Sequence, residues 1–328
     1  MKKIVLAVVV LAVIAAGVFF GLRGRSSSPA HALAQIGAAV KARDLELFRR
    51  HVDLDSLLDR GLTSLLAAKD NDGWMTGLAK GAGSALKPTL AAGLKEGIES
   101  WVATGATTDA SGPVRAFVNA KVAELGQLEL RDVSDVSRDQ PNSTATVRLR
   151  HRRYDCELTA QVLLRQTPEG SFQLVEVTNI VDLMGQLLDG EAAWKQRENA
   201  RVRKEIDALL RIEDLEKSSR DELLGLRRKL VFTATVRNRT DQAVVRAEAV
   251  LTAATLSEPR ATKKWKVSFD RPIPAGQTEV LTWEFGANAF KAGETAIYQA
   301  KDDGLSITLE VESITLEGGR QIQVPYPE

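Results

Sequence analysis

Residues 230–236 read LVFTATV, and they begin a region in which apolar and polar residues alternate almost without interruption. This period of two is typical of half-buried strands. It returns in further short runs, at about 245–251, 265–269, 281–285, 296–300, 305–311 and 322–324. About seven short strands in this span predict an all-β sandwich over residues 230–328. The single cysteine, Cys156, lies outside it, so no disulfide can join the two sheets.

The preceding segment, residues 189–229, has a different character. Of its 41 residues, 11 are Lys or Arg and 10 are Asp or Glu. Acidic residues recur four positions before basic ones, a spacing that stabilises helices. The segment therefore predicts a charged helical connector. A fragment starting near Arg228 is then expected to fold alone, and proteases are expected to cut first between Lys217 and Lys229.

Residues 28–188 predict an α+β domain. Ser28 and Pro29 suit the N-cap and first position of a helix, and Asp44 and either Asp53 or Asp55 suit the caps of two more. Antiparallel strands are expected next, beginning near Leu128 and then at 144–150, 155–165 and 172–177. Helices followed by a meander also resemble the NTF2/cystatin-like cone, a likeness of fold that implies no site.

The glycine- and alanine-rich stretch at residues 73–105 carries signals both for and against a helix. Large apolar residues recur every four positions from Trp74 to Ile98, but interior glycines weaken a helix by about 1 kcal/mol each. Pro88 is expected to break the run or to start a new helix. Loosely packed core helices are favoured over a membrane-active or partner-binding helix.

The N-terminal segment, residues 1–27, predicts a membrane anchor. Ile4 to Leu22 contains 19 residues without a charge, about 28 Å as a helix, close to the hydrocarbon thickness of a bilayer. The alternative is a cleaved signal peptide, for which residues 30–32 (AHA) have the required form but lie far from the apolar run. Two basic residues flank the apolar run on each side, so the count of basic residues does not decide the orientation. The short N-terminal tail instead predicts a single-pass inner-membrane protein, N-in, with the exposed domains extracytoplasmic.

Composition narrows the class of protein. The formal net charge of +1 argues against a nucleic-acid partner. Three histidines and one cysteine make a Cys/His metal cluster hard to build, and no metal or cofactor is expected.

Two segments resemble known families. The pattern around Ser28-Pro29, Asp44 and residues 51–57 (HVDLDSL) resembles an uncharacterised bacterial family of membrane-anchored proteins of unknown function, over about residues 1–185. Residues 236–240 (VRNRT) and 273–278 (IPAGQT) are similar to the immunoglobulin-like modules of bacterial envelope proteins. The second resemblance implies an immunoglobulin-like β-sandwich, and neither family supplies catalytic residues.

The candidate sites are few. Arg148, Arg150 and Arg152 lie on one face of an expected strand, where guanidinium groups suit an anionic ligand. The alternative is a solvated face neutralised by carboxylates such as Asp155. Weaker candidates are a Ser84/Lys87 catalytic pair, a cation held by Asp53 and Asp55, a reactive Cys156 beside the arginines, and a metal shared by the histidines, which are His31, His51 and His151.

These observations predict a non-enzymatic, membrane-tethered envelope protein with a binding or scaffolding role. The expected partners are the membrane and either an envelope protein or an anionic ligand. No catalytic residue is assigned. The alternatives are an enzyme or small-ligand binder with a site in the α+β domain, and a scaffold that faces the cytoplasm.

Overall fold

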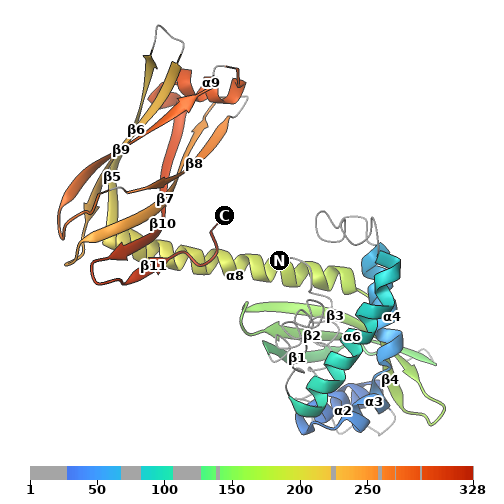
Figure 1. Ribbon diagram of the computed structural model, residues 1–328. Coiled ribbons are helices and arrows are strands. Elements are labelled where there is room, and N and C mark those ends of the chain that lie inside the picture. The colour runs from blue at the N-terminus through green and yellow to red at the C-terminus, as the bar shows by residue number, and fades with distance from the viewer. Residues whose placement is uncertain are drawn as a thin grey trace. The chain divides into compact units, whose positions relative to one another are not determined.

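A computed structural model describes residues 28–67, 83–105, 127–137, 141–222, 227–257, 261–269, 271–288 and 290–327 (Figure 1). Within them the protein is α+β, with six α-helices and three antiparallel sheets. The chain divides into two compact units, Met1–Trp194 and Lys195–Glu328. The predicted anchor, residues 4–22, lies outside the described residues. No helix within them is long and apolar enough to cross a membrane.

The first three helices begin where the sequence predicts. They are α2 (Pro29–Ala42), α3 (Leu45–His51) and α4 (Leu54–Ala67). The Ser28 hydroxyl accepts the His31 N–H at 3.1 Å, and Asp44 accepts the Leu47 N–H at 2.9 Å. Asp53 accepts the Ser56 N–H at 3.0 Å, which settles the choice between the two aspartates before α4. Each cap satisfies a backbone donor that the first helical turn leaves unpaired.

The helix α6 (Gly83–Thr104) runs through Pro88, so the expectation that this proline breaks the run is wrong. Its described apolar face buries Leu94, Ile98 and Val102 among the other helices. Burial of this kind contributes roughly 1.5–3 kcal/mol per side chain, enough to offset interior glycines.

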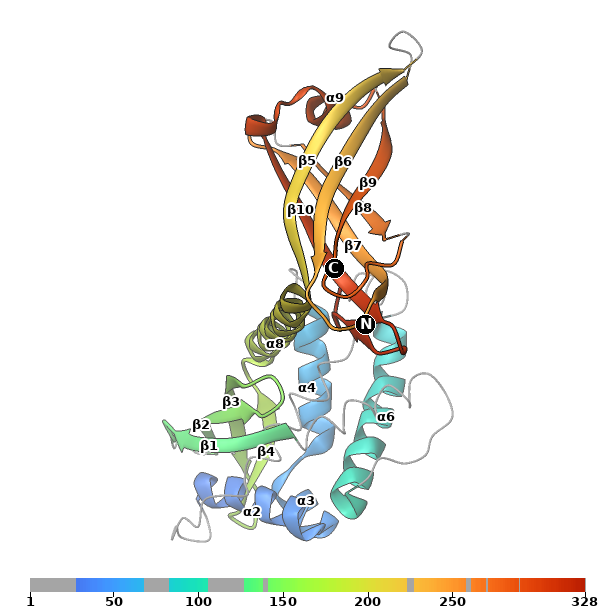
Figure 2. The ribbon, with the colours of Figure 1, turned by 90° about the vertical axis from the view of Figure 1, so that its left-hand side faces the viewer.

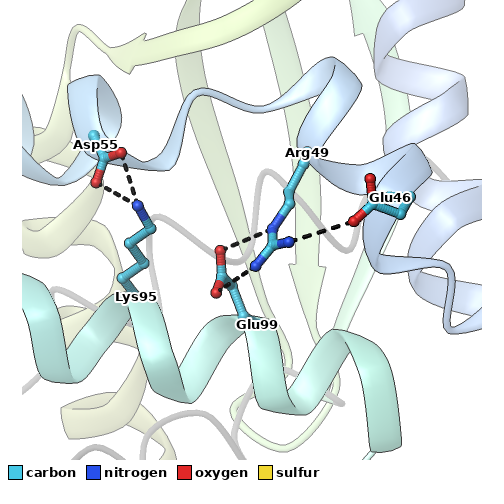
Figure 3. A network of polar contacts seen from close by, with 5 residues as sticks. All are labelled: Glu46, Arg49, Asp55, Lys95 and Glu99. Carbon is cyan, nitrogen blue, oxygen red and sulfur yellow. Dashed lines mark hydrogen bonds and ion pairs between the residues drawn. The ribbon is translucent and has the colours of Figure 1, made fainter.

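Ion pairs hold α6 against α3 and α4 (Figure 3). Arg49 of α3 donates to both carboxylate oxygens of Glu99, at 3.1 and 3.0 Å, and Lys95 contacts Asp55 of α4 at 2.7 Å. Exposed pairs of this type contribute little individually, so they fix the helix in place more than they stabilise it.

The sheet of the first unit is a meander in the order β1-β2-β3-β4, as predicted. Its strands are β1 (Leu128–Ser134), β2 (Asn142–His151), β3 (Cys156–Gln166) and β4 (Phe172–Val177). Alternate residues of β2 and β3 are buried, so one face of the sheet packs on the helices. The Asp53 N–H also donates to the Leu174 carbonyl at 3.0 Å, which attaches the corner between α3 and α4 to β4.

The charged segment at 189–229 is only partly helical, which corrects the predicted connector. The helix α8 (Ile180–Leu209) places Leu183 in the first core and Ile206 in the second, and then ends. The chain continues as the strand β5 (Leu210–Glu222), which pairs with β6 (Arg227–Asn238). A bulge between Ile212 and Asp214 shifts the alternation by one residue. The inward positions are therefore 210, 212, 215 and 217. The charged residues up to Asp207 lie in the helix α8, as predicted, whereas those from Arg211 onward belong to an edge strand.

The second unit has two antiparallel sheets around one core. One sheet has the order β5-β6-β9 and the other has the order β11-β10-β7-β8. The remaining strands are β7 (Val244–Thr255), β8 (Thr262–Ser268), β9 (Thr278–Ala287), β10 (Leu305–Leu316) and β11 (Gln321–Gln323). The rings of Phe232 on β6 and Trp265 on β8 lie 5.4 Å apart, so the two sheets meet across the core.

One predicted strand of this region is wrong. Residues 296–300 lie mostly within the helix α9 (Ala292–Gln299), in which Ile297 is the side chain buried in the core. The apolar residues of this segment therefore belong to a helix of about two turns with one side chain in the core, and not to a strand. A 3-10 turn (Asp302–Gly304) follows α9 and leads into β10.

Candidate functional site

The predicted arginine row is a surface of mixed charge. Arg150 forms an ion pair with Asp155, and Arg152 lies 3.6 Å from Glu129 of β1. The hydrogen bond that Arg150 donates to the Asp155 carboxylate also raises the pKa of Arg150. Arg148 is exposed and, in the part of the chain that the structure describes, forms no ion pair. Asp155 of the β2–β3 turn and Glu129 of β1 thus compensate two of the three guanidinium groups, and Arg152 lies in that turn and not on the strand as predicted.

The two aspartates proposed for a cation have separate roles. Asp53 accepts the Ser56 hydroxyl at 2.7 Å and an Arg165 N–H at 2.8 Å, and its bonds to Ser56 help to lower the pKa of its carboxyl group despite partial burial. Asp55 instead pairs with Lys95. Both carboxylates therefore stabilise the N-terminal end of α4 and its contacts.

The lysine of the proposed catalytic pair is also engaged. The Lys87 ammonium group donates to Asp59 at 2.5 Å and to the Thr63 hydroxyl at 2.8 Å, both on α4. The side chain of Ser84 lies outside the described set.

The structure brings two of the three histidines near each other, because His31 of α2 is close enough to His51 for its charge to help lower the pKa of His51. His51 ends α3 and contacts the Phe172 carbonyl, whereas His151 ends β2 and is fully buried. Among the described residues, no group of three or more potential metal ligands comes together.

A contact cluster that the sequence did not reveal forms where the β2–β3 turn meets α8. We call it the turn cluster, and it consists of His151, Arg153, Tyr154, Cys156, Gly190 and Trp194. The rings of His151 and Tyr154 stack at 4.0 Å, and the Arg153 guanidinium lies 4.6 Å from the Trp194 ring. The Tyr154 N–H donates to His151 Nδ1 at 3.1 Å, so the neutral ring carries its proton on Nε2.

Cys156 belongs to this cluster and is half-buried. A Cβ atom at Gly190 would lie only 2.4 Å from its sulfur, so the absence of a side chain at Gly190 lets α8 approach β3 closely. The thiol therefore packs between the strand β3 and the helix α8.

Gly190→Ala should therefore destabilise the first unit by about 1–3 kcal/mol, because the new methyl group overlaps Cys156. Gly185→Ala on the same helix is the matched control, since nothing lies within 4 Å of its added Cβ. That control should be neutral or stabilising by up to about 1 kcal/mol. Urea unfolding of both variants measures the difference, and equal stability of the two would contradict the close contact.

The partly buried imidazole of His51 should make the stability of the first unit depend on pH. Burial lowers the pKa of its imidazole below the usual 6.5, while the Phe172 carbonyl partly opposes this shift. The unfolded chain then binds the proton more readily, so stability should fall as the pH drops below about 6.5.

Hydrogen exchange of the full chain at pH 7.5 and 5.5 checks this dependence. Protection of the first unit should fall at the lower pH, and His51→Gln should reduce that fall. The second unit contains no histidine and serves as the internal control. An unchanged pH response in His51→Gln would rule out this residue as the cause.

The second unit contains a buried polar centre at Asn238, which is 0% exposed. Its side-chain amide donates to the carbonyls of Gln242, Ile273 and Pro274 at 2.8–3.1 Å, and its oxygen accepts the Thr240 N–H at 2.9 Å. The two segments that carry the resemblance to immunoglobulin-like modules are thus brought together here.

Lys217 is a second buried polar residue that sequence reasoning placed on a solvated connector. It is 9% exposed, and its ammonium group donates to the carbonyls of Tyr298 and Ala300, at 3.1 and 2.7 Å. The Ser219 hydroxyl also donates to the Tyr298 carbonyl, at 2.8 Å. The strand β5 therefore binds the C-terminal end of α9, where helix carbonyls lack partners.

Comparison with known proteins adds no family: no protein-family model matches the sequence, and no curated protein matches it.

Proposed function

We propose that this chain is a membrane-tethered protein of the bacterial cell envelope that acts by binding and not by catalysis. In this proposal, residues 4–22 anchor it as a single-pass inner-membrane protein with the N-terminus in the cytoplasm. The two folded units then face the extracytoplasmic side. The observation that carries the binding role is the architecture of the second unit, a sandwich of three strands over four.

The strand order of the second unit supports an immunoglobulin-like assignment. Seven strands form two antiparallel sheets, β5-β6-β9 and β11-β10-β7-β8, so the chain passes between the sheets after β6, β8 and β9. This pattern is similar to that of immunoglobulin-like modules, which commonly serve as binding domains. The inference is a fold analogy, so it supplies a class of function and no ligand.

The first unit supports a structural or binding role through its engaged side chains. Lys87, Asp53 and Arg150, which were the candidates for chemistry, each hold neighbouring elements together. The order of helices, meander and α8 fits the proposed likeness to the NTF2/cystatin-like cone and to the uncharacterised membrane-anchored family. The exposed Arg148 is the residue of the predicted row best placed to contact an anionic ligand.

Membrane fractionation tests the anchor on which this proposal depends. The full chain should remain in the membrane pellet after an alkaline carbonate wash, and deletion of residues 4–22 should release it. The measured mass of the full chain from the membrane pellet should be that of the uncleaved sequence, with the N-terminal segment still present. A shortened, soluble product would instead show a cleaved signal peptide and would contradict the tether.

A further inference from the structure

The second unit has one open side, formed by the edge strands β8 and β9 (Figure 2). Among the described strands, β8 pairs only with β7, and β9 pairs only with β6. Both ladders are regular: seven consecutive residue pairs join β7 to β8 and ten join β6 to β9, without a bulge. Regular edges of this kind are templates for pairing with another strand.

The other edges are protected against such pairing. The edge strand β5 carries a bulge between Ile212 and Asp214 and many charged side chains, and β11 is only three residues long. Bulges, charges and short length are the devices that natural sheets use to block edge pairing. The open side formed by β8 and β9 is therefore the side of the sandwich available for extension, except at the end near Lys263, where α9 contacts these strands.

The two open strands run in opposite directions. Trp265 of β8 stacks on Phe285 of β9 at 4.8 Å, and further along β8 the Ser268 carbonyl accepts the indole N–H of Trp283 at 3.0 Å. Residue numbers thus increase along β8 while they decrease along β9. A two-fold axis parallel to these strands would place β9 of a second copy antiparallel to β8, and β8 of that copy antiparallel to β9.

The same symmetry fixes the register of pairing. Rotation about an axis parallel to the strands does not change the position of a residue along that axis. Residues of β8 and β9 that lie at the same position along the axis in one copy therefore lie opposite each other in the ladder between copies. The stacked Trp265 and Phe285 then face each other across the new ladder, and Lys266 lies opposite Glu284. Both charged side chains are exposed, and they point to the outer face of their sheets.

Charge favours this pairing over its alternatives. On the outer face, β8 carries Lys264 and Lys266, and β9 carries Glu284 and no basic residue, whereas Lys263 and Glu279 lie on the inner face and Lys263 pairs with Glu294 of α9. Pairing β8 with β8 of another copy would oppose lysines. In the mixed ladder Lys266 instead faces Glu284, which also pairs with Arg220 and Lys229 of its own copy.

We propose that the second unit forms a two-fold symmetric dimer in which β8 of each copy pairs with β9 of the other. Each four-stranded sheet then continues into a three-stranded sheet of the partner, giving two continuous seven-stranded sheets. The contact is the same surface on both copies, so it closes and does not polymerise. This proposal does not depend on the membrane anchor.

Cysteine cross-linking of the full chain tests the register. In a Cys156→Ser background, Ser268→Cys combined with Thr282→Cys places two thiols opposite each other in the mixed ladder, within disulfide reach. Within one copy these positions lie on the outer faces of different sheets. Mild oxidation should give a covalent dimer, and the two substitutions tested singly should give at least about ten-fold less.

The control pair is Ser306→Cys with Thr282→Cys, because Ser306 lies on β10, two strands away from the open edge. Equal cross-linking in this control, or in either single variant, would show random collision and overturn the proposal. Polymers instead of dimers would also overturn it, because they would require an open contact.

Light scattering on the purified full chain tests the charge argument separately. The unmodified chain should have the mass of a dimer, and Lys266→Glu should raise its dissociation constant about ten-fold or more. Lys301→Glu, an exposed substitution outside the open edge, should leave it unchanged. A monomeric unmodified chain, or equal effects of both substitutions, would contradict the proposed interface.

Discussion

A fragment that begins at Arg228 should not fold, whereas one that begins at Lys195 should unfold in a single cooperative transition. The shorter fragment lacks β5, which contributes Leu210 and the half-buried Ile212 and Leu215 to the core of the second unit. It also lacks Ile206 of α8, which is fully buried there. Full burial of a side chain contributes roughly 1.5–3 kcal/mol, so losing several is comparable to the whole stability of an ordinary domain, about 5–15 kcal/mol.

Deletion of β5 also leaves polar groups without partners. The carbonyls at the end of α9 lose Lys217 and Ser219, and the long strand β6 becomes an edge. Circular dichroism and thermal unfolding of the two fragments measure the effect. A cooperative transition in the fragment from Arg228, equal to that of the fragment from Lys195, would show that β5 is dispensable. The expected protease site at Lys217 is likewise revised, because this residue is buried in a strand.

Asn238→Ala should destabilise the second unit by about 3 kcal/mol or more, the largest effect expected of a single substitution here. The substitution leaves three carbonyls, those of Gln242, Ile273 and Pro274, without the amide that now donates to them. Each carbonyl keeps one other donor, which is the Thr240 hydroxyl, the Val244 N–H or the Gln277 N–H, so the cost is that of several lost hydrogen bonds at about 0.5–1.5 kcal/mol each. The turn at residues 238–242 also loses the bonds to Thr240.

Asn288→Ala is the matched control for this effect. The Asn288 side chain also accepts a backbone N–H, from Phe290 at 2.9 Å, but the residue is exposed. Its loss should cost less than about 1 kcal/mol, because water can replace the bond. Urea unfolding of both variants compares them. Similar losses of stability would mean that the buried centre at Asn238 is not what joins these segments.

Features with local causes could be predicted from the sequence. Ser28 and Asp44 cap helices through bonds to residues three positions ahead, so the relevant partners lie within a short window. The strands at 142–151 and 156–166 alternate regularly and are joined by a short turn, which made the meander predictable. The general α+β class and the β-rich second half followed from the same patterns.

Features with distant causes could not be predicted in this way. The bulge at Ile212–Asp214 hides the strand period of β5, and its inward Lys217 is satisfied by carbonyls more than 80 positions later. The local sequence contains charged residues at helical spacing, but it contains no information about the distant strands with which they form a sheet. The α9 helix was missed for a similar reason, since its one core residue, Ile297, gives no periodic signal.

The candidate site shows the same limit. The sequence predicted Arg148, Arg150 and Arg152 on one face, with Asp155 as a neutralising carboxylate in the alternative reading. The structure adds Glu129 of β1, which lies beside Arg152. The turn cluster joins residues near 151–156 with residues 190–194, and no local signal connects them. The close approach at Gly190 is visible only once α8 lies against β3.

The proposed function depends on the side of the membrane on which the two folded units lie. Two reporters fused after Tyr326 measure it directly: a phosphatase that is active only after export and a fluorescent protein that folds only in the cytoplasm. We expect an active phosphatase and no fluorescence, and we expect phosphatase activity to be lost when residues 4–22 are deleted. Fluorescence together with an inactive phosphatase would place both units in the cytoplasm and would contradict the proposed function.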